Sequence, residues 1–219
     1  MSLQSFAYPW EGLEDFLERD SDGRLYLVGY GSLMNRESAA LTLPQREETL
    51  PPVVASGCRR IFNYRMPDAA FTRYGPAKSP RHRAALNVEM TGDPQDSVNG
   101  VVQVIEAKDL EGLRSREVDY RLVSVQASDW ESGAARPEPF FILVFESPYR
   151  DLLPHSGYVE VCANGARRIS EDFYVTFITN SFLADGATRL LEDYEFKNAS
   201  EDGFDRLSKE NAIQPDSFS

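Results

Sequence analysis

The sequence has few of the side chains on which many catalytic and metal sites depend. It contains only two histidines, His82 and His155, and two cysteines, Cys58 and Cys162. The histidines form no HxH or HExxH motif and the cysteines have no CxxC spacing, which argues against a histidine-dependent triad, a metal centre and a disulfide framework. We expect the histidines at the surface or at helix caps, and the cysteines as small residues of the core.

Long hydrophobic runs and an excess of positive charge are also missing. The longest apolar stretch, FFILVF at residues 140–145, is too short to cross a bilayer, and no apolar run follows a basic start. Lysines and arginines provide most of the affinity for nucleic acids, whereas this chain carries a net charge of −12. We therefore expect a soluble, cytoplasmic protein that binds neither nucleic acid nor membrane.

Three common nucleotide and nucleophile motifs are absent. In GYGSLM, at residues 29–34, Met34 stands where a dinucleotide fingerprint needs its third glycine. A GxSxG nucleophile elbow would need glycines at positions 30 and 34, which are Tyr30 and Met34. No GxxxxGKS or GxxxxGKT phosphate loop occurs. The chemistry must therefore depend on carboxylates and the backbone.

The chain is long and apolar enough to bury the core of one domain. It has 219 residues, of which 42% are hydrophobic. We predict an N-terminal extension over residues 1–23 with a short helix at residues 10–17, a single domain over residues 24–196, and an acidic polar tail over residues 197–219.

Hydrophobic periodicity and turn residues predict a mixed α and β domain. Strands are expected at residues 24–30, 53–65, 84–90, 101–105, 120–125 and 139–147. Gly57 should mark a bulge in the second strand or a place where another group approaches its backbone closely, and Asn99-Gly100 should form the turn of a hairpin between the third and fourth. Residues 35–44 should form a short helical or irregular passage that ends at Pro44. Another helix should start near Asp109, and two helices should follow from residue 156, separated at Gly165.

The first strand ends in a short glycine-containing stretch. A glycine lets a ligand approach the main chain closely, and successive N–H groups can then act together as donors. We therefore interpret the backbone of Gly31, Ser32 and Leu33 as a candidate binding loop; the alternative is a tight turn.

Glu117 occupies a position at which an apolar residue is expected. In the helix that starts near Asp109, Leu110, Leu113 and Glu117 follow the i, i+3, i+7 spacing of a core-facing stripe. Loss of hydration would raise the pKa of the Glu117 carboxyl toward the range useful for an acid or base near neutral pH. The alternatives are a frayed helix end or an exposed ion pair with Arg121.

Two distant motifs together resemble the γ-glutamylcyclotransferase-like family, which includes ChaC-type and AIG2-like proteins. These are Tyr30-Gly-Ser-Leu33 after the first strand, and LRSREVDYRLV at residues 113–123 after the strand and helix start NGVVQVIEAKDL. The resemblance covers residues 25 to about 180. Family members often place an aromatic residue or asparagine directly after the tetrapeptide, whereas here Met34 and then Asn35 follow.

The resemblance implies an α+β fold, a compact mixed β-barrel with flanking helices. It implies an enzyme, classed as a transferase or lyase, that converts a small γ-glutamyl compound such as glutathione to 5-oxoproline and a free amine. Glu117 would be the catalytic acid and base, without metal or organic cofactor. The substrate-binding residues would be Tyr30, Gly31, Ser32, Leu33 and Tyr158.

Several basic residues are further candidates for contacts with an anionic substrate. Arg59 and Arg60 are adjacent on a strand and so point to opposite faces; a surface ion pair is the alternative role. Arg73 and Lys78 lie in a long loop, residues 67–83, where a second substrate carboxylate could bind.

A non-catalytic module that binds a small ligand or a protein on the same fold is the competing interpretation, because a fold does not determine a function. The leaving group, the oligomeric state, and the roles of the N-terminal extension and acidic tail stay open at this level.

Overall fold

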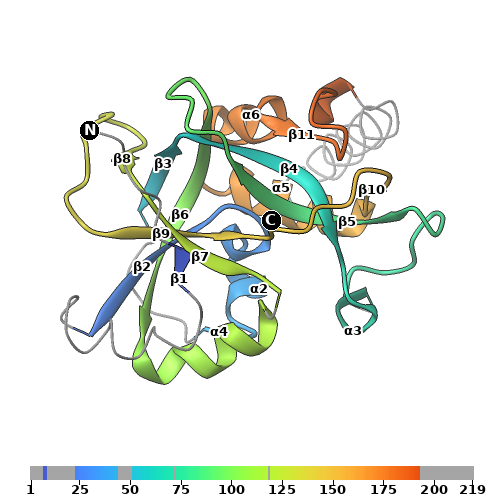
Figure 1. Ribbon diagram of the computed structural model, residues 1–219, viewed down its shortest axis with the longest axis horizontal. Helices are drawn as coiled ribbons and strands as arrows, with labels where there is room; N and C mark the ends of the chain where they lie inside the picture. The colour runs from blue at the N-terminus through green and yellow to red at the C-terminus, as the bar shows by residue number, and fades with distance from the viewer. Residues whose placement is uncertain (1–6, 9–22, 44–50, 72, 118, 193–219) are drawn as a thin grey trace, which may run out of the picture.

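The computed structural model describes residues 7–8, 23–43, 51–71, 73–117 and 119–192, and in them the strands form two sheets (Figure 1). The seven-stranded sheet has the order β1 (Ala7–Tyr8), β7 (Arg121–Val125), β9 (Phe140–Val144), β2 (Arg24–Gly29), β6 (Ser97–Glu106), β3 (Pro52–Ser56) and β8 (Ala127–Asp129). The four-stranded sheet has the order β10 (Leu153–Pro154), β5 (His82–Met90), β4 (Cys58–Arg65) and β11 (Ser181–Phe182).

Short helices flank the two sheets, which contact each other through β4 with β6 and β5 with β9 (Figure 1). The α-helices are α2 (Arg36–Ala39), α3 (Asp68–Phe71), α4 (Leu110–Arg116), α5 (Ser156–Arg167) and α6 (Glu171–Thr179). Single 3-10 turns are η2 (Ser32–Met34), η3 (Ala107–Asp109) and η4 (Leu190–Glu192). The predicted fold class, a mixed β structure with flanking helices, is confirmed.

The predicted first strand forms the middle of the larger sheet as β2. It pairs in parallel with β9, Tyr26 opposite Phe140, and antiparallel with β6 on its other side. All five side chains of β9 are buried, as expected for a strand with two apolar faces. This central position fixes the place at which the glycine-containing stretch leaves the sheet.

The prediction of one bulged strand over residues 53–65 is wrong. The chain leaves β3 at Ser56, turns at Gly57, and continues as β4 in the other sheet. Gly57 has a φ of +75°, a conformation that glycine adopts at little cost. The glycine therefore moves the chain from one sheet to the other.

The predicted hairpin at Asn99-Gly100 is also wrong. Both residues lie within β6, opposite Val53 and Val54 of β3, and β5 and β6 belong to different sheets. The side chain of Asn99 is buried, where its Nδ2 donates to the carbonyl of Phe173 over 2.8 Å. A Cβ on Gly100 would lie 2.8 Å from the carbonyl oxygen of Gly29, so this glycine permits close packing against β2 and not a turn.

The two helices predicted after residue 156 are present as α5 and α6, but the break between them lies at Arg168–Ser170, after the predicted Gly165. Gly165 is inside α5, where a Cβ would lie 2.7 Å from both the Met34 carbonyl carbon and the Asn35 nitrogen. This glycine therefore lets α5 pack directly against the backbone that follows the glycine loop, which consists of Gly31, Ser32 and Leu33.

Replacing Gly165 by alanine should push α5 away from the Met34–Asn35 backbone. Because backbone atoms cannot move aside as a side-chain tip can, we expect a loss of stability of about 1–3 kcal/mol in chemical denaturation. Asn164→Ala, at an exposed position of the same helix, is the control and should have little effect. Equal stability of both variants would contradict the close contact.

Some expectations fall on residues that the structure does not describe. The helix predicted at residues 10–17 and the tail at residues 197–219 lie outside the described ranges, while Ala7–Tyr8 of the N-terminal extension pairs with β7. Among the described helices, none has the length and apolarity needed to cross a membrane.

Candidate functional site

A pocket opens where the glycine loop leaves β2. It holds about 290 Å³ of unfilled space, part of it open to solvent. All six residues predicted for the site line it: Tyr30, Gly31, Ser32, Leu33, Glu117 and Tyr158. The remaining lining consists of Val28, Gly29, Leu86, Tyr120 and Leu143. Segments far apart in the sequence therefore meet at one place.

Glu117 lies at the C-terminal end of α4, where its N–H donates to the carbonyl of Leu113 over 2.9 Å. Its side chain is 14% exposed. Burial raises the pKa of the Glu117 carboxyl above its ordinary value of 4.5, and the nearby charges of Arg116 and Arg73 only partly oppose this effect. The predicted desolvated carboxylate is therefore present at the pocket.

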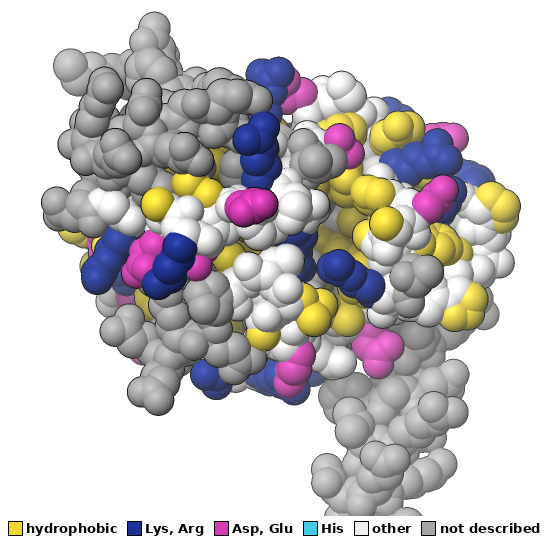
Figure 2. Space-filling model, turned by 90° about the horizontal axis from the view of Figure 1, so that it is seen from below, with side chains coloured by type: hydrophobic (Ala, Val, Ile, Leu, Met, Phe, Trp, Pro, Cys, Tyr) yellow, Lys and Arg dark blue, Asp and Glu magenta, His cyan; other side chains and the backbone are white. Residues whose placement is uncertain are grey.

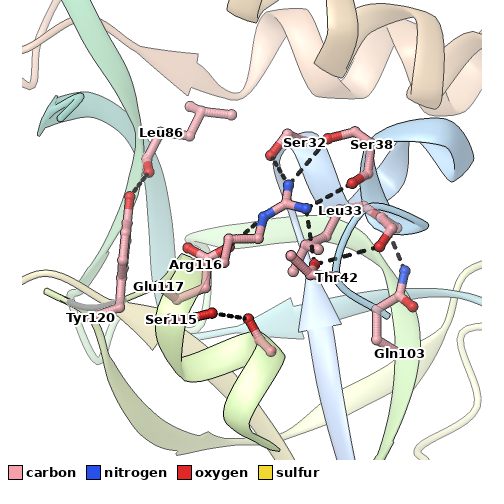
Figure 3. A network of polar contacts seen from close by, with 12 residues as sticks. Ser32, Leu33, Ser38, Thr42, Leu86, Gln103, Ser115, Arg116, Glu117 and Tyr120 are labelled. Atoms are coloured by element: carbon pink, nitrogen blue, oxygen red, sulfur yellow. Dashed lines mark hydrogen bonds and ion pairs between the residues drawn. The ribbon is translucent and has the colours of Figure 1, made fainter. Parts of the chain in front are cut away.

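Arg116 holds Glu117 and the glycine loop together (Figure 3). Its Nε lies 3.0 Å from Oε1 of Glu117, and its Nη2 donates to Oγ of Ser32 over 2.8 Å. Further hydrogen bonds reach Oγ and the carbonyl of Ser38, and Oγ1 of Thr42. With its side chain 8% exposed, Arg116 is a largely buried cation that fixes the carboxylate relative to the loop.

The alternative ion pair between Glu117 and Arg121 is not formed. Arg121 pairs instead with Glu146, with 3.1 Å between Nε and Oε2. Because α4 ends at Arg116, the i, i+4 geometry of a helix does not extend past Glu117. Sequence reasoning did not identify Arg116, although it stands next to the candidate carboxylate.

The glycine loop forms a single 3-10 turn that begins at Ser32. The first N–H groups of such a turn have no carbonyl partner within it, so those of Ser32 and Leu33 can serve as donors to a ligand. Gln103 holds the loop in position, because its Nε2 donates to the carbonyl of Leu33 over 2.8 Å. Asn35, at the departure from the family pattern, caps α2 by accepting from the N–H of Ser38 over 3.0 Å.

Tyr158 and Gly31 are in close contact. A Cβ on Gly31 would lie 2.7 Å from the Tyr158 hydroxyl and 3.5 Å from Cδ1 of Leu86. Tyr158 is 7% exposed, and burial raises its pKa well above the ordinary value, so it is a neutral phenol at neutral pH. Because Gly31 has no side chain, the Tyr158 hydroxyl can occupy the space that a Cβ would take.

We expect Gly31→Ala to lower any turnover at this pocket about tenfold, because the methyl group must displace either the Tyr158 hydroxyl or the loop. The measurement is kcat/KM of the variant against wild type. Gly31→Ala combined with Tyr158→Phe, which lacks the clashing hydroxyl, should recover part of the loss. A Gly31→Ala variant with wild-type kcat/KM would contradict the contact.

Two other tyrosines are fixed by backbone carbonyls. The Tyr30 hydroxyl donates to Leu143 over 2.8 Å, and the Tyr120 hydroxyl donates to Leu86 over 2.7 Å. Burial raises the pKa of both phenols well above the ordinary value. They form a rigid, uncharged wall around Glu117.

The loop at residues 67–83 approaches the pocket through Tyr74, whose ring centroid lies 5.2 Å from that of Tyr158. Burial raises the pKa of Tyr74, and the charge of Arg116 and a hydrogen bond with Ser32 oppose this effect only in part. His155 supports this loop from within: it is fully buried between Phe71 and Tyr74, and burial lowers its pKa. His155 is the N-cap residue of α5, as one of the two expectations had it, but its side chain makes no cap hydrogen bond, and the expectation of a surface position is wrong.

The basic candidates have different surroundings. Arg59 forms the expected surface ion pair, 3.1 Å from Asp96, whereas Arg60 is fully buried and donates to Asn99 Oδ1 over 3.0 Å. Burial lowers the pKa of Arg60 to about 10. Arg73 is exposed, and its positive charge acts to lower the pKa of Glu117. Lys78 is also exposed, and it does not line the pocket.

The cysteines are buried and unpaired as expected, and burial raises the pKa of each thiol to about 12. Within the described ranges, no three His, Cys, Asp or Glu side chains are grouped so that they could hold a metal ion.

Two solved structures share this architecture. YkqA from Bacillus subtilis has a TM-score of 0.55 at 17% identity, over 76% of this chain and 56% of that one. A γ-glutamyl cyclotransferase has the same TM-score at 15% identity, over 82% of this chain and 99% of its own. Neither a family model nor a curated protein sequence matches the chain. The chain spans little more than half the length of YkqA, and the likeness concerns the fold: this protein has the γ-glutamylcyclotransferase-like fold.

Proposed function

We propose that the protein converts a γ-glutamyl amino acid, peptide or amine to 5-oxoproline and the free amine. The observation that carries this proposal is a single buried carboxyl group with a raised pKa, Glu117, on the wall of a pocket whose other side is the glycine loop. The fold shared with a γ-glutamyl cyclotransferase supports it.

The reaction needs one group that first takes a proton and then returns it. Glu117 accepts a proton from the α-ammonium of the substrate, and the free amine attacks the γ-carbonyl carbon of the same molecule to form a new C–N bond. The original amide C–N bond then breaks as the departing nitrogen receives the proton from Glu117, and the ring nitrogen passes its surplus proton to the released amine, which departs as an ammonium. The carboxylate is regenerated, and the substrate provides its own nucleophile at high effective concentration.

The backbone of the glycine loop has the complementary task. The N–H groups of Ser32 and Leu33 donate either to the α-carboxylate or to the γ-carbonyl oxygen, on which negative charge develops during the attack. Arg116 keeps these donors and the carboxylate at a fixed separation through Ser32 and Glu117.

The test is to incubate the purified protein with γ-glutamyl amino acids, glutathione and γ-glutamyl amines, and to quantify 5-oxoproline by mass spectrometry. We expect release from at least one compound, and loss of release in Glu117→Gln. A wild-type protein that is stabilised thermally by these compounds but releases no 5-oxoproline would replace the proposal with the binding-module interpretation.

A further inference from the structure

A second pocket lies next to the candidate active site. It holds about 570 Å³ of unfilled space, part of it open to solvent, and three of its lining residues are the aromatic residues Tyr64, Phe145 and Tyr149. Figure 2 shows apolar side chains gathered between charged ones on the right half of the face. Figure 1 places α3 on the same side, and α3 follows directly after the lining residues Tyr64–Pro67.

The two pockets are neighbours because they share an aromatic wall. Tyr120, in the first pocket, lies 4.7 Å from Tyr64 and 6.3 Å from Phe145, measured between ring centroids. The negative charge of Glu117 also reaches Tyr64, where it helps to raise the pKa of the phenol. The rings of Tyr120 and Tyr64 therefore lie between Glu117 and the second pocket.

The aromatic lining is held in place by the protein. Asn87, which is fully buried, accepts from the Phe145 N–H over 2.7 Å and donates to the Phe145 carbonyl over 2.9 Å. The Tyr149 N–H donates to the Asn63 carbonyl over 2.9 Å, and the Phe145 and Tyr149 rings are parallel within 5°. Tyr149 is 39% exposed, so one wall of the pocket is a fixed ring that faces solvent.

The two acidic residues that line this pocket already interact with neighbouring side chains. Asp119 accepts a hydrogen bond from the Tyr64 hydroxyl over 3.0 Å, and Asp68 pairs with Arg83, so both acids have partners. Arg65 is exposed at the rim, where it can meet a carboxylate. The lining is therefore complementary to an aromatic or bulky apolar group that carries a carboxylate.

We propose that the second pocket binds the leaving group of the substrate, and that the preferred leaving group is an aromatic amino acid. This inference rests on the proposed function. Because Glu117 must protonate the departing nitrogen, the group attached to that nitrogen lies beside Glu117, next to the shared wall. An aromatic side chain that extends from there past Tyr120 and Tyr64 packs against Phe145 and Tyr149 in the second pocket.

The test compares γ-glutamyl-phenylalanine with γ-glutamyl-alanine, which differ by one phenyl ring and share the γ-glutamyl group and the carboxylate. We expect kcat/KM for the phenylalanine compound to be at least about tenfold higher. Tyr149→Ala should bring this ratio toward one, whereas Val175→Ala, 43% exposed on α6, should keep the wild-type ratio. A ratio near one in the wild type, or a high ratio that Tyr149→Ala leaves intact, would overturn the inference while 5-oxoproline release still supports the proposed function.

A binding measurement separates the two proposals if neither compound releases 5-oxoproline. Free L-phenylalanine is the amine product, and its contact with the protein can be measured by saturation-transfer NMR with L-alanine as the reference. A phenylalanine signal that Tyr149→Ala removes would support the second pocket without the reaction. No signal above that of alanine would end the inference, whereas the proposed function depends on the wider set of γ-glutamyl compounds.

Discussion

Replacing Glu117 by glutamine should reduce kcat for 5-oxoproline release by about 10²–10⁴-fold, the range for loss of general acid and base catalysis. Glutamine has nearly the same shape and still accepts a hydrogen bond from Arg116, but it cannot take a proton from the α-ammonium. The loss should appear mainly in kcat, because the substrate contacts of the glycine loop remain. Glu111→Gln, at an exposed position of α4, should keep the wild-type rate.

The same variant should be at least as stable as the wild type. A raised pKa means that the folded protein binds the Glu117 proton more tightly than the unfolded chain does. Between the ordinary value of 4.5 and the raised pKa, wild-type stability therefore falls as the pH rises, and above the raised pKa the full cost is present. Glutamine removes this cost, so thermal unfolding at pH 7 should occur at an equal or higher temperature. A large drop in that temperature, together with lost activity, would indicate a structural role for Glu117 instead.

Arg116→Gln should lower kcat/KM at neutral pH about 10²-fold, because the carboxylate and the glycine loop lose their common anchor. The charge and hydrogen bond of Arg116 lower the pKa of Glu117, so their removal should raise it further. The acidic limb of the profile of kcat/KM against pH should therefore move to higher pH.

This shift separates positioning from simple destabilisation, since partial unfolding would reduce the amount of active protein without moving the limb. Arg114→Gln, at an exposed position of the same helix, is the matched control and should leave the limb in place. If Arg116→Gln lost activity with an unchanged limb, Arg116 would not act through Glu117.

The sequence predicted the parts of the site that depend on local pattern. The first strand is apolar and ends in glycines, and Glu117 continues the spacing of Leu110 and Leu113 although α4 ends at Arg116. Both could therefore be identified without neighbours in space, since each is visible within about ten residues of chain. The fold class followed from the family resemblance that the two motifs carry together.

The features that were missed depend on contacts between distant segments. Strand-forming residues continue on both sides of Gly57, so a change of sheet could not be distinguished from a bulge. Arg116 is adjacent to Glu117 in sequence, but the helical i, i+4 rule pointed to Arg121 because the end of α4 was not predicted to the residue. The contact of Tyr74 with Ser32 and the aromatic wall of the second pocket arise only when both sheets are assembled.

The parallel pairing of β2 with β9 has a consequence for how the protein is made. Residues 26–28 can find their partners at residues 140–142 only after most of the chain has left the ribosome. Until then β2 has an unpaired apolar edge, which is a template for association with other chains. Pairing between such distant segments is also slow. We therefore expect fragments that end before β9 to aggregate, and the pocket to form late in folding.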